Sequence, residues 1–305
     1  MDTLAFVFSG QGAQYPGMGK ELYETSPAAR RVFDAADAIR PGTSKQCFEG
    51  TAEELAQTIN TQPCVFCMDL AAAESLREAG LEPCVAAGFS LGEVAALTFA
   101  GAFDFETGFR LVCRRAEFMQ EAAERYDGAM VAVLRLPPDT VKELCERFEN
   151  TYPVNYNSAA QTVVALLKAN QEAFVKAVQE AGGKAVPLAV SGGFHSPFMD
   201  RAAEQLREVL DEIEMKDPKI PVYANSTALP YDKDPKDLLA RQVNHPVLWQ
   251  KTVEAMAAGG IETMIEVGPG KTLCGLIKKT APGVRILNVE NTAGVEAAKE
   301  AFSAE

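Results

Sequence analysis

Histidine and tryptophan are scarce in this chain. Its 305 residues include two histidines, His195 and His245, and one tryptophan. Histidine is the side chain that most often acts as a general base near neutral pH. Any mechanism that needs such a base must therefore use one of these two residues.

Long apolar runs are missing as well. No stretch approaches the ~18 apolar residues of a membrane-spanning helix. Residues 1–8 lack the basic segment of a secretory signal peptide, and their apolar core is too short for one. The seven cysteines are odd in number and scattered, without the spacing of a disulfide framework. We therefore expect a cytoplasmic protein with reduced thiols that does not enter a membrane.

Positive charge is in deficit, with 29 Lys and Arg against 42 Asp and Glu and a net charge of −13. This balance argues against nucleic acid as a main partner. Cys64 and Cys67 have C-x-x-C spacing but lack the second pair that a zinc site needs. The segment 270–272 lacks the first glycine of a P-loop. We therefore predict no metal site and no nucleotide hydrolysis.

The most informative segment is residues 88–93, with the sequence GFSLGE. It follows an apolar, strand-like run and precedes a helix-like stretch, which is the context of the G-x-S-x-G nucleophile elbow. The sharp turn would lift Ser90 out of the sheet. The N–H of Leu91, at the helix start, would then be free to bind an oxyanion. An ordinary glycine-rich turn is the alternative.

The order of predicted elements indicates two parts. Strands and helices alternate before residue 127 and after residue 194, which predicts an α/β domain with a mostly parallel sheet, α/β-hydrolase-like, over residues 1–126 and 195–305. Residues 127–194 read as βαββαβ, an inserted ferredoxin-like subdomain. Its expected strands are 129–134, 152–157, 162–167 and 185–190, and its expected helices are 139–148 and 171–181.

Of the two histidines, His195 is the stronger candidate for the base of Ser90. It lies in the loop that leaves the predicted subdomain, and loops at such junctions often line a cleft. His245 precedes Pro246 and is more typical of a loop or a helix start. We expect a rate that rises through a histidine pKa of roughly 6 to 7. A structural role for both histidines stays open.

Two further segments could contribute to a site. The glycine-rich loop at residues 9–19 follows the first strand and could aim backbone N–H donors at an oxyanion. Arg115 lies on a helix with an apolar stripe and could bind a carboxylate with its fork. From the residues alone, a solvated surface arginine is the more ordinary interpretation.

Five segments together resemble, in order, the motifs of the malonyl-CoA:acyl-carrier-protein transacylase family, the free-standing malonyl transferases of bacterial fatty-acid synthesis. They are residues 10–14, 88–93, 115–120, 191–197 and 266–271. The resemblance covers essentially the whole chain, and the βαββαβ insertion agrees with the small subdomain of that family.

The resemblance implies roles for individual residues. Ser90 would be the nucleophile and His195 its base. A main-chain carbonyl near Leu248, rather than an aspartate, would orient the histidine. Asn157 would lie in the cleft.

It also implies how the substrate is held. The backbone N–H groups of Gln11 and Leu91 would form the oxyanion hole, and Arg115 would hold the malonyl carboxylate. The chain departs from the family at Phe89, where His is usual, and at Gly193, where Pro or Ala is common. Leu248 stands where Gln is common, although its backbone carbonyl survives the change. Phe89 makes the floor beside the nucleophile less polar, which affects the expected choice of acyl group more than the reaction.

The implied reaction is malonyl transfer from malonyl-CoA to the phosphopantetheine thiol of an acyl carrier protein, with neither metal nor redox cofactor. We expect a monomer. A serine esterase or thioesterase is one alternative, and a non-catalytic scaffold that recruits carrier protein is another. Because carrier proteins are acidic, this acidic chain needs a local basic patch, for which Lys271, Lys278, Lys279 and Arg285 are candidates; a solvated helix face explains them equally well.

Overall fold

The computed structural model describes residues 3–190, 192–232 and 234–303, so Ser191 of the histidine-containing loop lies outside the described residues. The strands are β1 (Leu4–Phe8), β2 (Val85–Gly88), β3 (Gly128–Leu134), β4 (Thr151–Ser158), β5 (Gln161–Leu167), β6 (Lys184–Pro187), β7 (Val222–Tyr223), β8 (Thr263–Val267) and β9 (Arg285–Val289). The helices are α1 (Lys20–Thr25), α2 (Pro27–Ile39), α3 (Thr43–Glu49), α4 (Ala52–Ala56), α5 (Thr58–Glu78), α6 (Leu91–Phe99), α7 (Phe105–Arg125), α8 (Pro138–Cys145), α9 (Gln171–Glu180), α10 (Asp200–Glu212), α11 (Pro235–Arg241), α12 (Trp249–Ala258), α13 (Thr272–Thr280) and α14 (Thr292–Ser303).

The larger sheet has the strand order β7-β2-β1-β8-β9, and every neighbouring pair is parallel. Its strands β1 (LAFVF) and β2 (VAAG) are wholly apolar, as expected for parallel strands covered on both sides. In β1, Leu4, Phe6 and Phe8 pack into the core shared with α2, α5, α6 and α7. Ala5 and Val7 point the other way, into the core shared with α12 and α13. The predicted α/β architecture is confirmed.

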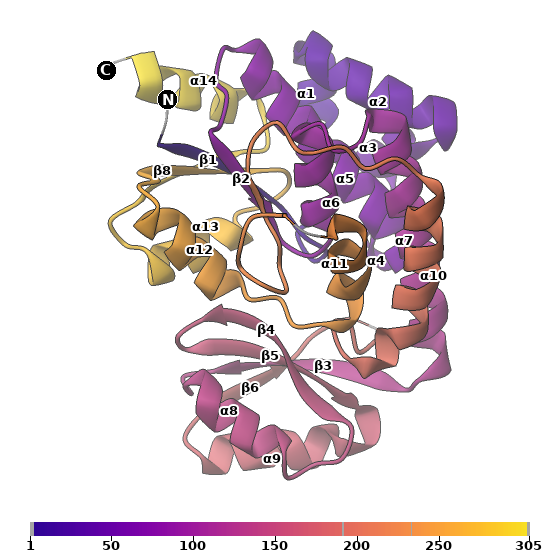
Figure 1. Ribbon diagram of the computed structural model, residues 1–305, viewed down its shortest axis with the longest axis vertical. Helices are drawn as coiled ribbons and strands as arrows, with labels where there is room; N and C mark the ends of the chain where they lie inside the picture. Colours follow the sequence, from indigo (N-terminus) through magenta and orange to yellow (C-terminus); the bar gives the residue numbers. More distant parts are fainter. Residues whose placement is uncertain (1–2, 191, 233, 304–305) are drawn as a thin grey trace.

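The smaller sheet is antiparallel, with the order β4-β5-β3-β6. In Figure 1 it lies below the parallel sheet, and α8 and α9 cover its outer face. This is the predicted ferredoxin-like arrangement. Its last strand ends at Pro187 rather than at the expected residue 190, and just beyond it the Leu188 N–H still donates to the Met130 carbonyl oxygen of β3 at 2.9 Å. The strands of this sheet all lie within residues 128–187; the domain boundaries at 126/127 and 194/195 stay predictions.

Local capping signals set several helix starts. Ser26 caps α2 through its side chain, and Thr51 and Glu54 form a capping box at α4. The helical spacing of apolar residues between 65 and 76 predicts a helix over residues 62–79. Helix α5 begins earlier, at Thr58, so Pro63 lies inside it. The longer helix brings the Thr58 hydroxyl beside the glycine-rich loop. None of the helices in the described part of the chain has the length and apolarity to cross a membrane.

Candidate active site

The candidate residues follow the carboxyl ends of neighbouring parallel strands. The loop with Gln11 follows β1, Ser90 follows β2, and Asn225 lies just past β7. Parallel strands bring their carboxyl ends to one edge of the sheet, where α/β proteins bind ligands. These residues, which are far apart in the sequence, therefore lie at one edge of the parallel sheet.

The two glycines of the elbow are needed for close packing between β2 and α6. A Cβ on Gly88 would come within 1.9 Å of the Gly92 carbonyl group. A Cβ on Gly92 would lie 2.4 Å from the Phe8 carbonyl oxygen of β1. Between them, Ser90 has φ 55° and ψ −108°, a conformation that is unfavourable for a side chain other than glycine. Strain of this kind persists only where the surroundings impose it, so the conformation at Ser90 differs from that of an ordinary glycine-rich turn.

Ser90, His195 and Gln242 form a linear hydrogen-bonded array. The Ser90 Oγ lies 2.8 Å from His195 Nε2, and His195 Nδ1 lies 2.8 Å from the Gln242 carbonyl oxygen. A carbonyl oxygen can only accept, so Nδ1 carries the proton and Nε2 is left to accept from the serine hydroxyl. The tautomer required of a general base is thus imposed by the backbone.

The orienting carbonyl belongs to Gln242, and the prediction of Leu248 is wrong. Leu248 is the N-cap of α12, and its carbonyl oxygen accepts from the backbone N–H and the hydroxyl of Thr252. That carbonyl is therefore engaged by its own helix. His245 does not reach the serine either, since its Nδ1 contacts the Arg241 carbonyl and the Asn244 side chain.

Arg115 of α7 points into the same site and is only 1% exposed, so the interpretation as a surface arginine is wrong. Its Nη1 donates to Gln62 Oε1 at 2.6 Å, and its Nη2 donates to Gln242 Oε1 at 2.8 Å and to Ser90 Oγ at 3.1 Å. Its Nε is buried and has no acceptor among the described residues. A buried cation with an unused donor beside the nucleophile is suited to a substrate carboxylate.

Burial controls the charge state of both groups. Burial, and to a smaller extent the nearby Arg115 cation, together lower the pKa of His195 to about 4. Burial also lowers the pKa of Arg115 to about 10, although the Glu93 carboxylate opposes this. At neutral pH the histidine is therefore a neutral base and the arginine remains a cation. The expectation of a histidine pKa of roughly 6 to 7 is wrong, because it assumed a solvated ring.

The loop after β1 is pressed against the elbow. A Cβ on Gly10 would lie 2.6 Å from the Phe89 carbonyl oxygen, and the Gln11 side chain is held by the Thr58 hydroxyl at 3.1 Å. The N–H of Leu91 is the first of α6 and has no intrahelical acceptor. The arrangement is compatible with the predicted pair of oxyanion donors.

A cleft opens between the two sheets beside this loop. Gln11 and Phe89 line it from the parallel sheet, and Asn155 and Asn157 line it from β4. The Oδ1 atoms of both asparagines are buried and have no donor among the described residues. Asn157 thus lines the cleft, and its role there stays a prediction.

Three polar residues of the site were not predicted. Gln62 and Gln242 hold Arg115, and Asn225 accepts the Ser90 N–H. Asn225 could have been found from its place just past a parallel strand. Gln62 on α5 and Gln242 in a short turn carry no comparable local signal.

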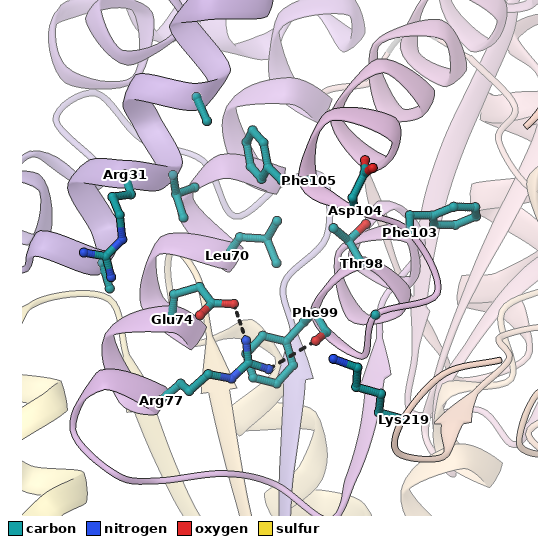
Figure 2. A pocket seen from close by; sticks show the side chains of 14 residues that line it. Arg31, Leu70, Glu74, Arg77, Thr98, Phe99, Phe103, Asp104, Phe105 and Lys219 are labelled. Carbon is teal, nitrogen blue, oxygen red and sulfur yellow. Dashed lines mark hydrogen bonds and ion pairs between the residues drawn. The ribbon is translucent and has the colours of Figure 1, made fainter. Parts of the chain in front are cut away.

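A second pocket, shown in Figure 2, lies away from this chemistry. Phe99 in its wall ends α6, the helix that begins beside Ser90. Its Arg77 is already engaged, donating to Glu74 Oε1 at 2.6 Å and to the Phe99 carbonyl oxygen at 3.2 Å. None of the predicted site residues lines it. The cleft beside Ser90 is thus the candidate active site.

Known proteins resemble this chain over essentially its whole length. The family described as "Acyl transferase domain" matches residues 5–298. The malonyl CoA-acyl carrier protein transacylase of Bacillus subtilis (strain 168) is 39% identical over 313 residues, which cover 100% of this chain and 99% of that protein. The crystal structure of the corresponding protein from Clostridium perfringens has a TM-score of 0.95 at 36% identity, covering 99% and 98% of the two chains.

A further solved structure is a type II PKS acyl-carrier protein in complex with its malonyl-transacylase. It has a TM-score of 0.95 at 34% identity, and the match covers 98% of this chain and 100% of that one. Both the sequence match and the structural match extend over essentially the whole chain. The chain therefore belongs to the acyl transferase domain family, alongside the malonyl CoA-acyl carrier protein transacylases.

Proposed function

We propose that this protein transfers a malonyl group from malonyl-CoA to the phosphopantetheine thiol of an acyl carrier protein, through a malonyl ester on Ser90. The observation that carries the proposal is the buried Arg115 guanidinium, whose Nη2 lies 3.1 Å from Ser90 Oγ. A malonyl group differs from an acetyl group by one carboxylate. A cation at this distance from the nucleophile can bind that carboxylate while the thioester carbon faces the serine.

The first half-reaction acylates the enzyme. His195 Nε2 takes the proton of Ser90 as Oγ attacks the thioester carbon. The N–H groups of Gln11 and Leu91 stabilise the oxyanion. The carbon–sulfur bond then breaks, and the imidazolium returns its proton to the departing thiolate of coenzyme A.

The second half-reaction reverses these roles. The phosphopantetheine thiol gives its proton to His195 and attacks the ester carbon, and the carbon–Oγ bond breaks as Ser90 regains its proton. The Gln242 carbonyl keeps His195 in the required tautomer throughout. The steps use side chains and backbone groups alone. The pathway is fatty-acid or polyketide synthesis, and we propose that the protein acts as a cytoplasmic monomer.

A serine esterase is the alternative from another class. A hydrolase of neutral esters gains nothing from a buried cation beside its nucleophile, because the cation would have no partner. One experiment distinguishes malonyl transfer from hydrolysis. The protein is incubated with radiolabelled malonyl-CoA and phosphopantetheinylated carrier protein, and label is followed on protein and in free malonate. Label on carrier protein supports transfer, whereas label mainly in malonate supports hydrolysis.

The pH dependence of acylation should report the buried histidine. His195 acts only while neutral, and burial lowers its pKa to about 4. We therefore expect kcat/KM for malonyl-CoA to stay level from neutral pH down to about pH 5 and to fall only below that. A decline centred near pH 6.5, the value of a solvated imidazole, would contradict this assignment.

His245 provides the matched control for this base. His195→Ala should slow acylation about 10²- to 10⁴-fold. His245→Ala should leave the rate near that of the wild type, since its ring contacts Arg241 and Asn244 instead. Equal losses in the two variants would remove the assignment.

We propose that the carrier protein docks beside α13. Lys278 and Lys279 are exposed near its C-terminal end, and Lys271 is exposed just before it, next to Leu273 of the cleft wall. Arg285 does not belong to this patch, because it contacts Thr263, Ala301 and the Phe302 ring. A basic surface at the cleft edge would offset the repulsion between two acidic proteins.

Charge reversal tests this docking surface. Lys278→Glu with Lys279→Glu should raise KM for carrier protein about tenfold and leave KM for malonyl-CoA unchanged. Lys20→Glu with Lys45→Glu changes the net charge by the same amount at exposed positions of α1 and α3. Equal effects from the two pairs would mean that total charge, and not this patch, controls docking.

A further inference from the structure

We infer that Asn225 is a positioning residue that fixes the backbone of the nucleophile elbow, and thereby aims Ser90 at the acyl carbon. Its side chain bridges the residues on either side of Phe89. Asn225 Oδ1 accepts the Ser90 N–H at 2.7 Å, and Asn225 Nδ2 donates to the Gly88 carbonyl oxygen at 2.6 Å. The side-chain amide of Asn225 thus links the backbone before the turn to the backbone after it.

The turn needs such support. Ser90 adopts φ 55° and ψ −108°, and an unsupported chain would relax away from this conformation. Both atoms of the Asn225 amide are used, one as acceptor and one as donor, and no shorter or purely accepting side chain can reproduce both contacts. The residue itself is only 1% exposed, so bulk water does not share either contact.

Asn225 is in turn held by its own backbone. Its N–H donates to Glu93 Oε2 at 2.7 Å, and its carbonyl oxygen accepts the Leu248 N–H at 2.8 Å. Glu93 lies in the first turn of α6, and its other carboxylate oxygen accepts the Tyr231 hydroxyl. Asn225 is therefore hydrogen-bonded to the elbow at Gly88 and Ser90 and to the first turn of α6 at Glu93.

The same amide is coupled to the other reacting groups. Gln242 Nε2 donates to the Ser90 carbonyl oxygen at 2.6 Å and to Asn225 Oδ1 at 3.2 Å. The carbonyl of Gln242 orients His195. Displacing Asn225 would thus disturb the distance between Ser90 Oγ and His195 Nε2, without removing any group that contacts the substrate.

Removing the side chain should affect the chemical step and not substrate binding. In Asn225→Ala the elbow loses both contacts, and a displacement of about 1 Å costs about 10²-fold in rate. Rapid-quench acylation across malonyl-CoA concentrations should therefore show a rate constant about 10²-fold lower at saturation, with an unchanged half-saturation concentration. A rate within about threefold of wild type, or a loss that appears only in half-saturation, overturns the inference.

Asn225→Asp separates the acceptor from the donor. The new carboxyl group can accept the Ser90 N–H at any pH, but it can donate to the Gly88 carbonyl only while protonated. The ratio of variant to wild-type acylation rate should therefore fall at least tenfold between about pH 5 and about pH 9. Titratable or charged groups around this position are Glu93, Tyr231, Arg115 and His195. Because burial raises the pKa of Glu93 to about 7, the carboxyl group at position 225 and Glu93 titrate as a coupled pair, and the fall in the ratio spans the titration of both. A ratio that is constant over this range overturns the donor role.

Two controls exclude general damage. The first control is Asn170 of the small subdomain, whose Nδ2 also donates to a backbone carbonyl oxygen, that of Glu149. Asn170→Ala and Asn170→Asp should be acylated at the wild-type rate at every pH. Melting curves at each pH confirm that rates are compared between folded proteins. If Asn225→Ala does not fold, the Asp variant at low pH carries the test.

The inference rests on the proposed function, and one further readout keeps the two apart. Labelling of Ser90 by a fluorophosphonate probe needs an aligned nucleophile but no malonyl group. If wild type reacts with the probe and is not malonylated by malonyl-CoA, the proposed function fails while the inference stands. If wild type is malonylated and Asn225→Ala reacts with the probe at the wild-type rate, the inference fails.

Discussion

Ser90→Ala should abolish malonyl-enzyme formation and with it both half-reactions, lowering the transfer rate by at least about 10⁴-fold. Ser90 Oγ is the atom that His195 Nε2 and Arg115 Nη2 approach, at 2.8 and 3.1 Å. Alanine removes this oxygen while keeping the backbone that Asn225 holds, so we expect the variant to fold. Intact-mass measurement after incubation with malonyl-CoA should find the mass of one added malonyl group on the wild type and none on the variant.

Ser75 is the matched control for this experiment. It is a buried serine of α5 whose hydroxyl contacts the Ala71 carbonyl and the Ser26 side chain, with no link to the cleft. Ser75→Ala should be malonylated like the wild type. A malonyl ester that persists on Ser90→Ala would place the nucleophile elsewhere and remove the proposed mechanism.

Arg115→Ala should reverse the preference for malonyl over acetyl groups. In the wild type, an acetyl group leaves the buried guanidinium without its partner, at a cost of roughly 3–5 kcal/mol. This corresponds to about two to three and a half orders of magnitude in kcat/KM between the two thioesters. Removing the cation should sharply reduce malonyl transfer, while acetyl transfer falls little or rises. The measurement is kcat/KM for malonyl-CoA and acetyl-CoA in both proteins.

A lysine at this position tests the geometry of the fork. Arg115→Lys keeps a positive charge but offers a point charge in place of planar donors, and it cannot maintain the contacts to both Gln62 and Gln242. We expect only partial recovery of the malonyl preference. If the malonyl-to-acetyl ratio is the same in wild type and Arg115→Ala, the arginine does not bind the carboxylate and the esterase alternative gains support.

Features governed by neighbouring residues were predictable. The G-x-S-x-G pattern predicts the elbow, Ser26 before Pro27 predicts an N-cap, and Thr51 with Glu54 predicts a capping box. Each depends on contacts within a few residues, and the structure contains all three. The βαββαβ order could also be predicted, because the period of the apolar residues differs between strands and helices. Boundaries were less accurate, as at the early start of α5, since propensity near a proline does not reveal what the helix packs against.

The sequence by itself determined the elbow, the two-part α/β architecture and the candidate pair Ser90 and His195, because these follow from local pattern and from the shortage of histidine. Only the tertiary structure decided that Gln242, and not Leu248, orients the imidazole, and that Arg115 is buried beside the serine. It also set the pKa of His195 at about 4. These properties depend on contacts between residues far apart in the sequence and on how completely those contacts exclude water. Desolvation of a side chain is caused by every residue packed around it, and the local sequence does not reveal which residues those are.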